Sequence, residues 1–198
     1  MRYAADHKEK TRRRILEAAA VVFRRKGFQA GSVDDVMAQA GLTAGGFYAH
    51  FASKDELFAE AMVQTLSEAR VLRGKEDESL SGADHVRSIA RKYLSPAHRK
   101  MVEQGCVMPP LLADVSRQNE PARRSIQNIV AETIATLQPH LNEAGLRDPD
   151  QAYALLALMI GGMTLARSTA DEELSDRILS ACRALIDTAL ATSGEHSG

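Results

Sequence analysis

The chain has 198 residues and a formal net charge of −1, and because 44% of its residues are hydrophobic it can bury a sizeable core. Aromatic residues make up only 5% and Trp is absent, while Ala, Leu, Arg and Glu are frequent, a composition that favours an all-α protein. No apolar run reaches the roughly 18 residues of a membrane span, the charged N-terminus predicts no secretion signal, and two cysteines are too few for a disulfide framework. A membrane-spanning or disulfide-rich class is therefore excluded, and we expect a protein of the reducing cytoplasm.

The first 54 residues predict three helices and the beginning of a fourth. Their apolar spacing and their capping residues place the helices at 8–26, 33–40 and 44–51, and from Ser53 to about 72. Gly27 should end the first helix, and Ser32 is a good N-cap for the second. The head of the chain therefore reads as a small three-helix domain.

The remaining residues predict a larger helical body. After a polar stretch at 74–82, helices are expected at 84–94, 97–104, 109–118, 122–144, 149–169 and 172–191. Pro139 should kink the long helix or end it early. The predicted fold class is thus all-α, with a head over residues 1–53 and a body over 54–198.

Charge divides along the same line. Residues 1–54 hold ten Lys or Arg against five acidic residues, which leaves −6 for the rest of the chain. A basic head suits an end that meets phosphate, although a solvated helix surface would also be charged.

The segment from Gly41 to Leu57 reads GLTAGGFYAHFASKDEL. Gly41 lies just past a helix, where a C-terminal cap needs a residue without a Cβ, and Thr43 can cap the next helix by accepting a backbone N–H bond. Helix, glycine turn and second helix within about twenty residues predict a helix-turn-helix, whose second helix enters the DNA major groove.

Residue by residue, this segment resembles the DNA-binding signature of the TetR family of bacterial transcriptional repressors. The signature runs Gly, aliphatic, Ser/Thr, any, Gly, small, aromatic or aliphatic, Tyr, any, His/Tyr, Phe, any, Ser/Asn, Lys, acidic, any, Leu, and every specified position is met. The resemblance implies a helix-turn-helix head and a body that binds an effector and dimerises. It also implies a function in transcription, without catalysis and without a cofactor.

Roles in DNA binding follow for the matching positions. Phe47 and Phe51 should face the core, whereas Tyr48 and His50 should face outward. The expected DNA-contacting residues are Ser32, Thr43, Ala44, Gly45, Gly46, Tyr48, His50 and Lys54. Each could instead be a surface or capping residue. No Arg, Asn or Gln lies between Thr43 and Phe51 for bidentate base contacts, so discrimination would rest on Tyr48, methyl contacts, water and DNA shape.

The last two helices are expected to pair two copies of the chain. Residues 153–166 are apolar nearly all round and include Gly161 and Gly162, while the final helix carries an apolar stripe that includes Cys182. Two heads held a helical turn apart would read a palindromic operator in double-stranded DNA. The same stripes could instead pack within one subunit.

By the same resemblance the body should bind a small apolar effector that releases the protein from DNA. Candidate lining residues are Met62, Leu66, Tyr93, Cys106, Met108, Leu111, Ile126, Met159 and Met163, for each of which core packing is the alternative. Cys106 follows Gly105, and a Gly-Cys at this place resembles a subgroup of these repressors, some of which respond to electrophiles or oxidants. A thiol-sensing repressor that acts through Cys106 is therefore an alternative, and an inert buried Cys is another.

Two rival classes have less support. No nucleophile elbow, HExxH motif, phosphate loop or CxxC motif occurs, so we expect no enzyme, and the six His show no metal-ligand spacing. A DNA-binding protein without an effector would not need so large a body. Loss of DNA binding on addition of a ligand would separate these classes.

Overall fold

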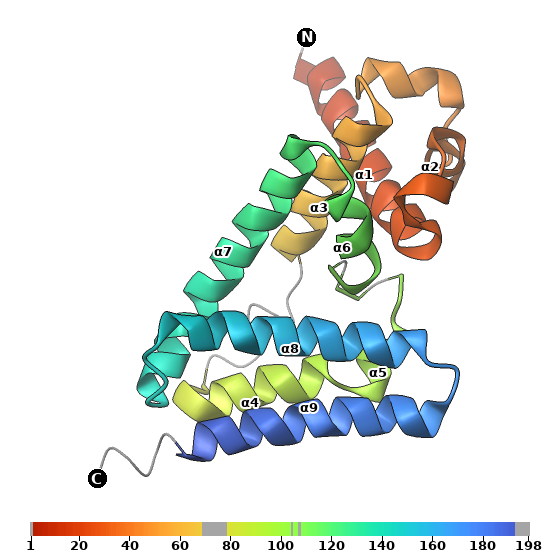
Figure 1. The fold of residues 1–198 in the computed structure, drawn as a ribbon. Helices are drawn as coiled ribbons and strands as arrows, with labels where there is room; N and C mark the ends of the chain where they lie inside the picture. Colours follow the sequence, from red (N-terminus) through yellow and green to blue (C-terminus); the bar gives the residue numbers. More distant parts are fainter. Residues whose placement is uncertain (1, 69–78, 104, 107, 193–198) are drawn as a thin grey trace. The chain divides into compact units, whose positions relative to one another are not determined.

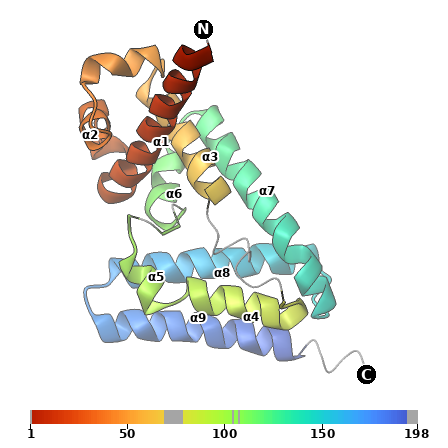
Figure 2. The same ribbon diagram turned by 180° about the vertical axis from the view of Figure 1, so that it is seen from behind.

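The computed structural model describes residues 2–68, 79–103, 105–106 and 108–192, except for the side chains of residues 2–5 and 65–68. Every regular element in these ranges is a helix (Figures 1 and 2), so the predicted all-α class is confirmed. The chain divides into two compact units. Unit 1 comprises residues 1–68 and 102–129, and unit 2 comprises residues 69–101 and 130–198.

Unit 1 is built around α1 (Arg2–Ala30), which packs against α2 (Val33–Gln39), α3 (Lys54–Glu68) and α6 (Met108–Ser116). Helix α1 begins at Arg2, six residues earlier than predicted. Gly27 interrupts it with φ 76° and ψ 171°, which confirms the predicted break. The carboxylate of Asp114 in α6 accepts a 2.8 Å bond from the Phe28 N–H directly after the break.

An aromatic cluster closes the core of this unit. Phe23 and Phe28 of α1 and Phe58 of α3 meet with ring centroids 4.8–6.0 Å apart. Large rings packed edge to face supply much of a small domain's apolar burial. The cluster ties the first and fourth predicted helices together.

In the head, Ser32 and Ser53 cap the helices that follow them as predicted, whereas Thr43 does not. Ser32 Oγ accepts the Asp35 N–H at 3.0 Å and Asp35 Oδ2 accepts the Ser32 N–H at 3.0 Å, a capping box. Ser53 Oγ likewise caps α3 through the Glu56 N–H at 3.0 Å. The prediction that Thr43 caps the next helix with its side chain is wrong. The segment η1 (Ala44–Ala49) is a 3₁₀ helix shorter than expected, and the Thr43 hydroxyl makes no capping bond to it.

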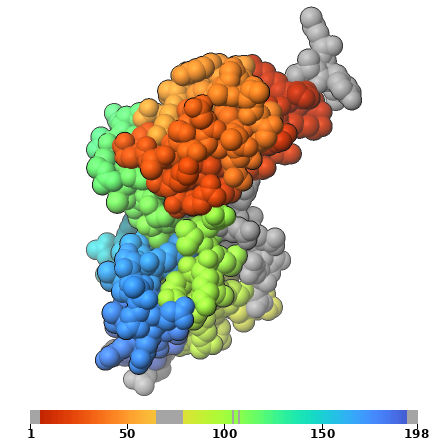
Figure 3. Space-filling view, turned by 90° about the vertical axis from the view of Figure 1, so that its right-hand side faces the viewer, coloured from red at the N-terminus to blue at the C-terminus, as the bar shows by residue number. Residues whose placement is uncertain are grey.

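Unit 2 is formed by α4 (Gly82–Tyr93), α5 (Pro96–Lys100), the C-terminal part of α7 (Glu120–Glu143), α8 (Pro149–Ser168) and α9 (Glu172–Thr192). Helices α8 and α9 form an antiparallel pair, with α4 packed against both (Figure 1). Figure 3 shows α9 (blue) beside the α4–α5 segment (yellow-green) on one face of this unit. Its core includes Tyr93, Leu94, Leu137, Met159, Met163 and Leu179, all fully buried.

Several predicted boundaries shift in the body. Helix α7 continues past Pro139 to Glu143, so the expectation that Pro139 ends it early is wrong. Helix α5 ends at Lys100 instead of 104, because Arg167 of α8 occupies its C-terminal carbonyls, binding Arg99 O at 3.2 Å and His98 O at 2.8 Å. Residues 69–78, which include the predicted end of the fourth helix and most of the polar stretch, lie outside the described residues. The functional boundary between residues 53 and 54 remains a prediction.

Candidate nucleic-acid interface

The helix-turn-helix is formed by α2, a glycine turn and η1. Gly41 adopts φ 65°, the left-handed region that the turn requires, and the Leu42 N–H closes it by donating to Met37 O at 2.8 Å. Phe47 and Phe51 are 0% and 1% exposed with their rings stacked 5.8 Å apart, which confirms that both face the core. These two rings fix which face of η1 points to solvent.

Tyr48 lies on that outward face. Its side chain is 76% exposed, and its ring centroid lies 5.1 Å from that of Phe47 with the two rings edge to face. The Tyr48 ring therefore packs on Phe47 while most of its surface stays in solvent. An exposed aromatic side chain on a recognition segment has the apolar body and polar tip that a base edge or a phosphate requires. The position agrees with the expected role, while the DNA contact itself remains a prediction.

Nothing within the fold requires glycine at positions 45 and 46 of η1. A Cβ on Gly45 would meet no atom within 4 Å, and one on Gly46 would make only an ordinary 3.7 Å contact with Met37 Cε. Neither residue has positive φ. Since neither packing nor backbone conformation requires glycine here, the missing side chains point to close approach by another molecule. Ala44 and Thr43 lie at the start of the same exposed segment.

Lys54 begins α3 and has contacts of its own. Its ammonium lies 3.4 Å from Gln29 O and 4.5 Å from the centre of the Phe28 ring. These weak contacts compete with a phosphate without neutralising the charge.

The Ser32 Oγ accepts a hydrogen bond in the capping box, so its hydroxyl proton is left to donate to DNA.

His50 ends η1 as its C-cap residue. Its Nδ1 is buried without a hydrogen-bond partner. Burial lowers the pKa of His50, and the positive charges of Lys8 and Arg12 lower it further. The imidazole is therefore neutral near pH 7 and presents a polar ring edge beside two cations.

Two cations of the run from Arg12 to Arg14 bind within unit 1. Arg12 donates to Glu60 Oε1 at 2.6 Å and lies over the Phe51 ring at 4.4 Å, so it joins α1 to α3 and η1. Glu60, through this hydrogen bond, raises the pKa of the Arg12 guanidinium. Arg13 faces Glu17 on its own helix at 3.7 Å. Arg12 and Arg13 are therefore both engaged by carboxylates of unit 1.

The predicted effector-lining residues are divided between the units. In unit 1, Met62, Cys106, Met108 and Leu111 are buried, Ile126 is half-buried, and the side chain of Leu66 lies outside the described residues. In unit 2, Tyr93, Met159 and Met163 are fully buried. Within each unit these side chains are part of the packed core, so a shared pocket remains a prediction.

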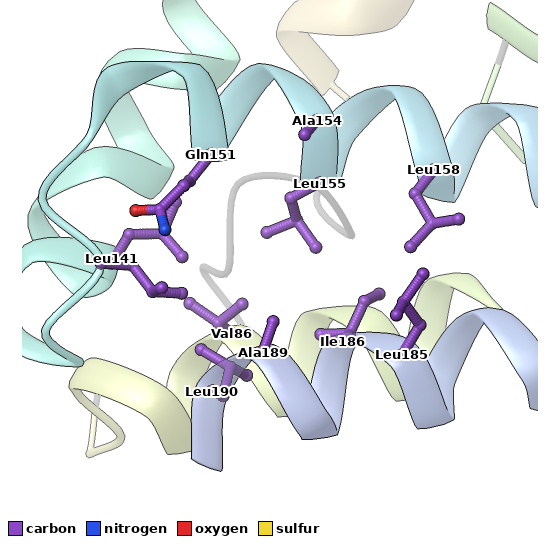
Figure 4. Close-up of a pocket in the computed structure, with 11 residues that line it drawn as sticks. Val86, Leu141, Gln151, Ala154, Leu155, Leu158, Leu185, Ile186, Ala189 and Leu190 are labelled. Carbon is purple, nitrogen blue, oxygen red and sulfur yellow. The ribbon is translucent and has the colours of Figure 1, made fainter. Parts of the chain in front are cut away.

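An apolar groove of about 360 Å³ lies elsewhere in unit 2, between the N-terminal half of α8 and the C-terminal half of α9 (Figure 4). It is lined by Val86, Leu141, Leu146, Gln151, Ala154, Leu155, Leu158, Leu185, Ile186, Ala189 and Leu190. Gln151 is the polar member, and its Oε1 is buried without a hydrogen-bond partner. The sequence analysis did not predict this groove. The apolar character of α8 and α9 is its only signal in the sequence, and the contributions of Val86 from α4 and Leu141 from α7 depend on tertiary packing.

The outward faces of α8 and α9 are also apolar. Leu165, Leu174 and Leu185 are 60%, 45% and 59% exposed. At helical spacing they extend into two stripes, Ala154, Leu158, Gly161 and Leu165 on α8, and Leu174, Ile178, Ala181 and Leu185 on α9. Polar residues such as Ser180 and Arg177 occupy another side of α9.

Over the described residues, no helix is long and apolar enough to cross a membrane. Within the same ranges, no three His, Cys, Asp or Glu side chains gather as metal ligands would.

Comparison with known proteins places the helix-turn-helix in a family. Residues 15–61 match the family model described as bacterial regulatory proteins, tetR family. The chain is 41% identical over 63 residues to the HTH-type transcriptional regulator YfiR of Bacillus subtilis, an alignment that covers 32% of the chain and only 31% of YfiR. It is 26% identical over 182 residues to the HTH-type regulator YdgC of the same bacterium, covering 77% of the chain and 92% of YdgC.

Solved structures share the whole fold. Reduced NemR of E. coli superposes with a TM-score of 0.77 at 20% identity, covering 90% of this chain and 96% of NemR. A TetR transcriptional regulator from Chloroflexus aurantiacus superposes with a TM-score of 0.76 at 20% identity, covering 94% and 96%. At these identities the superpositions show the fold alone, and they extend the likeness from the head to the body.

Proposed function

The chain belongs to the TetR family of bacterial regulatory proteins, and we propose that it is a homodimeric repressor that binds a palindromic operator and is released by a small molecule. Family membership makes it a DNA-binding regulator and not an enzyme. Repression, dimerisation and the effector are the proposed parts.

The bare outer face of η1 is the observation that supports DNA recognition most directly. Gly45 and Gly46 leave space that the fold does not use, beside a Tyr48 side chain that is 76% exposed. Base edges in the major groove are reached most closely where the protein backbone carries no side chain. We assign Thr43, Ala44 and Tyr48 to this contact, with Ser32, His50 and Lys54 toward the phosphates.

The stripes on α8 and α9 support dimerisation. Leu165, Leu174 and Leu185, which are 45–60% exposed along two antiparallel helices, form a face that water solvates poorly, and a second copy would cover it by packing as a four-helix bundle. The groove beside them opens between the same helices and would be covered as well. Two heads joined in this way would contact half-sites about one helical turn apart, or a multiple of it.

Effector binding is proposed for the body. A ligand releases DNA only if it binds one arrangement of the two heads better than the other. The buried methionines Met159 and Met163 of unit 2 support an adaptable apolar site within that unit, since Met side chains repack around irregular shapes. The alternative thiol sensor has less support, because Cys106 is only 6% exposed and a reagent would need access to its sulfur.

The test is fluorescence-anisotropy binding to the DNA that flanks the protein's own coding region, against a scrambled duplex of equal length. A preference of about a thousandfold or more, with two subunits per site, would support an autoregulating dimeric repressor. Equal, weak and salt-sensitive binding to both duplexes would contradict self-regulation. Failure to bind either duplex at low salt would contradict the DNA-binding role itself.

A further inference from the structure

Most cations near the helix-turn-helix are neutralised within the protein. Lys10 pairs with Asp6 at 2.9 Å, Lys26 with Asp35 at 2.7 Å, and Arg25 with Glu103 at 3.8 Å. With Arg12 and Arg13 bound as described, the net positive charge of the head overstates what it can offer to phosphate. In each of these pairs the carboxylate offsets part of the charge that its cation can offer to a phosphate.

Arg14 is different from its two neighbours. Among the described side chains no carboxylate lies within ion-pair distance of Arg14, and the residue is exposed. Its guanidinium lies against the glycine turn of the helix-turn-helix, so that a Cβ built on Gly41 would come within 2.6 Å of Nη2 and 3.8 Å of Cζ. The side chain is thus held against the turn that leads directly into η1.

Gly41 contributes in two ways to the contact between the Arg14 guanidinium and the turn. Its φ of 65° closes the turn, and its missing Cβ leaves the space that the guanidinium fills. A guanidinium carries five N–H donors in a rigid fork, and contact with one backbone face leaves the remaining donors for another acceptor. Phosphate oxygens are the planar fork's best-matched partners after carboxylates.

We propose that Arg14 forms a DNA-backbone binding site together with the Gly41 turn, in which its guanidinium binds a phosphodiester oxygen. This inference rests on the proposed DNA-binding function and adds a contact from α1, outside the recognition segment. The site recognises the phosphodiester and not the base, so it contributes equally to every DNA sequence. In the run of three arginines, Arg12 joins helices, Arg13 pairs on its own helix, and Arg14 binds DNA.

The run supplies its own controls. Arg14→Gln and Arg13→Gln remove the same charge from adjacent positions, so they alter the long-range field of the head alike. We would measure the binding of each variant and of the wild type to a mixed-sequence duplex about three helical turns long, from about 50 to 200 mM salt. Thermal unfolding of the three proteins shows whether each fold is intact.

Arg14→Gln is expected to weaken binding about tenfold at the low-salt end. It should also reduce the slope of log K against log salt by roughly 0.9, the release of one counterion. Arg13→Gln should leave the slope unchanged, and Arg14→Lys should restore it, since Lys keeps the charge.

Equal slopes for Arg14→Gln and Arg13→Gln would overturn the proposal, whatever their melting temperatures. If Arg14 only braces the turn, Arg14→Gln would lower the melting temperature and leave the salt slope as in the wild type. A wild-type protein that binds no duplex at the lowest salt would instead refute the proposed function, so the two failures are distinguishable.

Discussion

Gly162 of α8 lies directly against Cys182 of α9: a Cβ built on the glycine would come within 2.6 Å of the sulfur. Leu94 Cδ2 would lie 3.4 Å from the same Cβ. The two helices can approach this closely only because residue 162 has no side chain. Burial raises the pKa of the Cys182 thiol, and this effect is larger than the opposing effect of the positive charge on Arg183.

Gly162→Ala should therefore destabilise unit 2 by about 1–3 kcal/mol, because the added methyl forces the two helices apart. Gly161→Ala is the matched control within one subunit, since a Cβ there meets no atom of the same chain within 4 Å. That change should raise stability by about 0.5–1 kcal/mol through helix propensity. Because Gly161 lies on the proposed dimer face, both variants are compared at concentrations where that dimer has dissociated. Urea unfolding of both variants measures the difference, and equal effects would contradict the described contact.

The dimer face can be tested by charge. Leu185→Asp places a carboxylate at the C-terminal end of the α9 stripe, on a leucine that is 59% exposed, and we expect a protein that is monomeric at concentrations where the wild type is a dimer. Ser180→Asp adds the same charge on the polar side of α9 and should leave the dimer intact. Sedimentation equilibrium distinguishes the two, and dimers in both variants would place the interface elsewhere.

Gly45 tests the recognition face. Because the fold has open space at this position, Gly45→Leu should change the melting temperature little, as expected of a surface substitution. It should weaken specific DNA binding more than tenfold, since the side chain blocks close approach to the base edges. Tyr48→Ala is expected to weaken binding with the fold equally intact. Wild-type affinity in Gly45→Leu would show that η1 does not enter the groove.

DNA binding should depend on pH through His50. Its pKa is lowered below the ordinary 6.5 in the free protein by burial and by two cations, so the ring is neutral near pH 7. A nearby phosphate would favour the charged ring and raise that pKa, so the complex takes up a proton. Affinity should then increase as pH falls from about 7.5 to about 5.5.

The same titration on His50→Gln isolates the group. The variant should bind with weaker pH dependence than the wild type, because Gln cannot take up the proton. An unchanged pH profile would show that His50 does not face a phosphate.

Sequence reasoning succeeded where the decisive interaction is local. Ser32 and Ser53 cap the helices that follow them because the bonded N–H lies three residues away, and Gly41 closes its turn through neighbours in sequence. Phe47 and Phe51 face the core because helical spacing puts them on one side. Such signals need no knowledge of distant residues, and they predict the helix-turn-helix, while the family is indicated by the resemblance of residues 41–57 to its signature.

Tertiary structure decided whatever depends on partners far apart in the chain. Whether Arg12 or Arg14 is available to DNA depends on Glu60 and on the Gly41 turn, both remote in sequence, whereas Arg13 pairs locally with Glu17. Adjacent residues of a helix point about 100° apart, so neighbouring arginines meet different partners. The break at Gly27 is held by Asp114, far along the chain. The groove at Gln151 forms only where four helices meet. Local propensity fixes each helix and its caps, but which charge is neutralised and where a surface is left open are set by long-range packing.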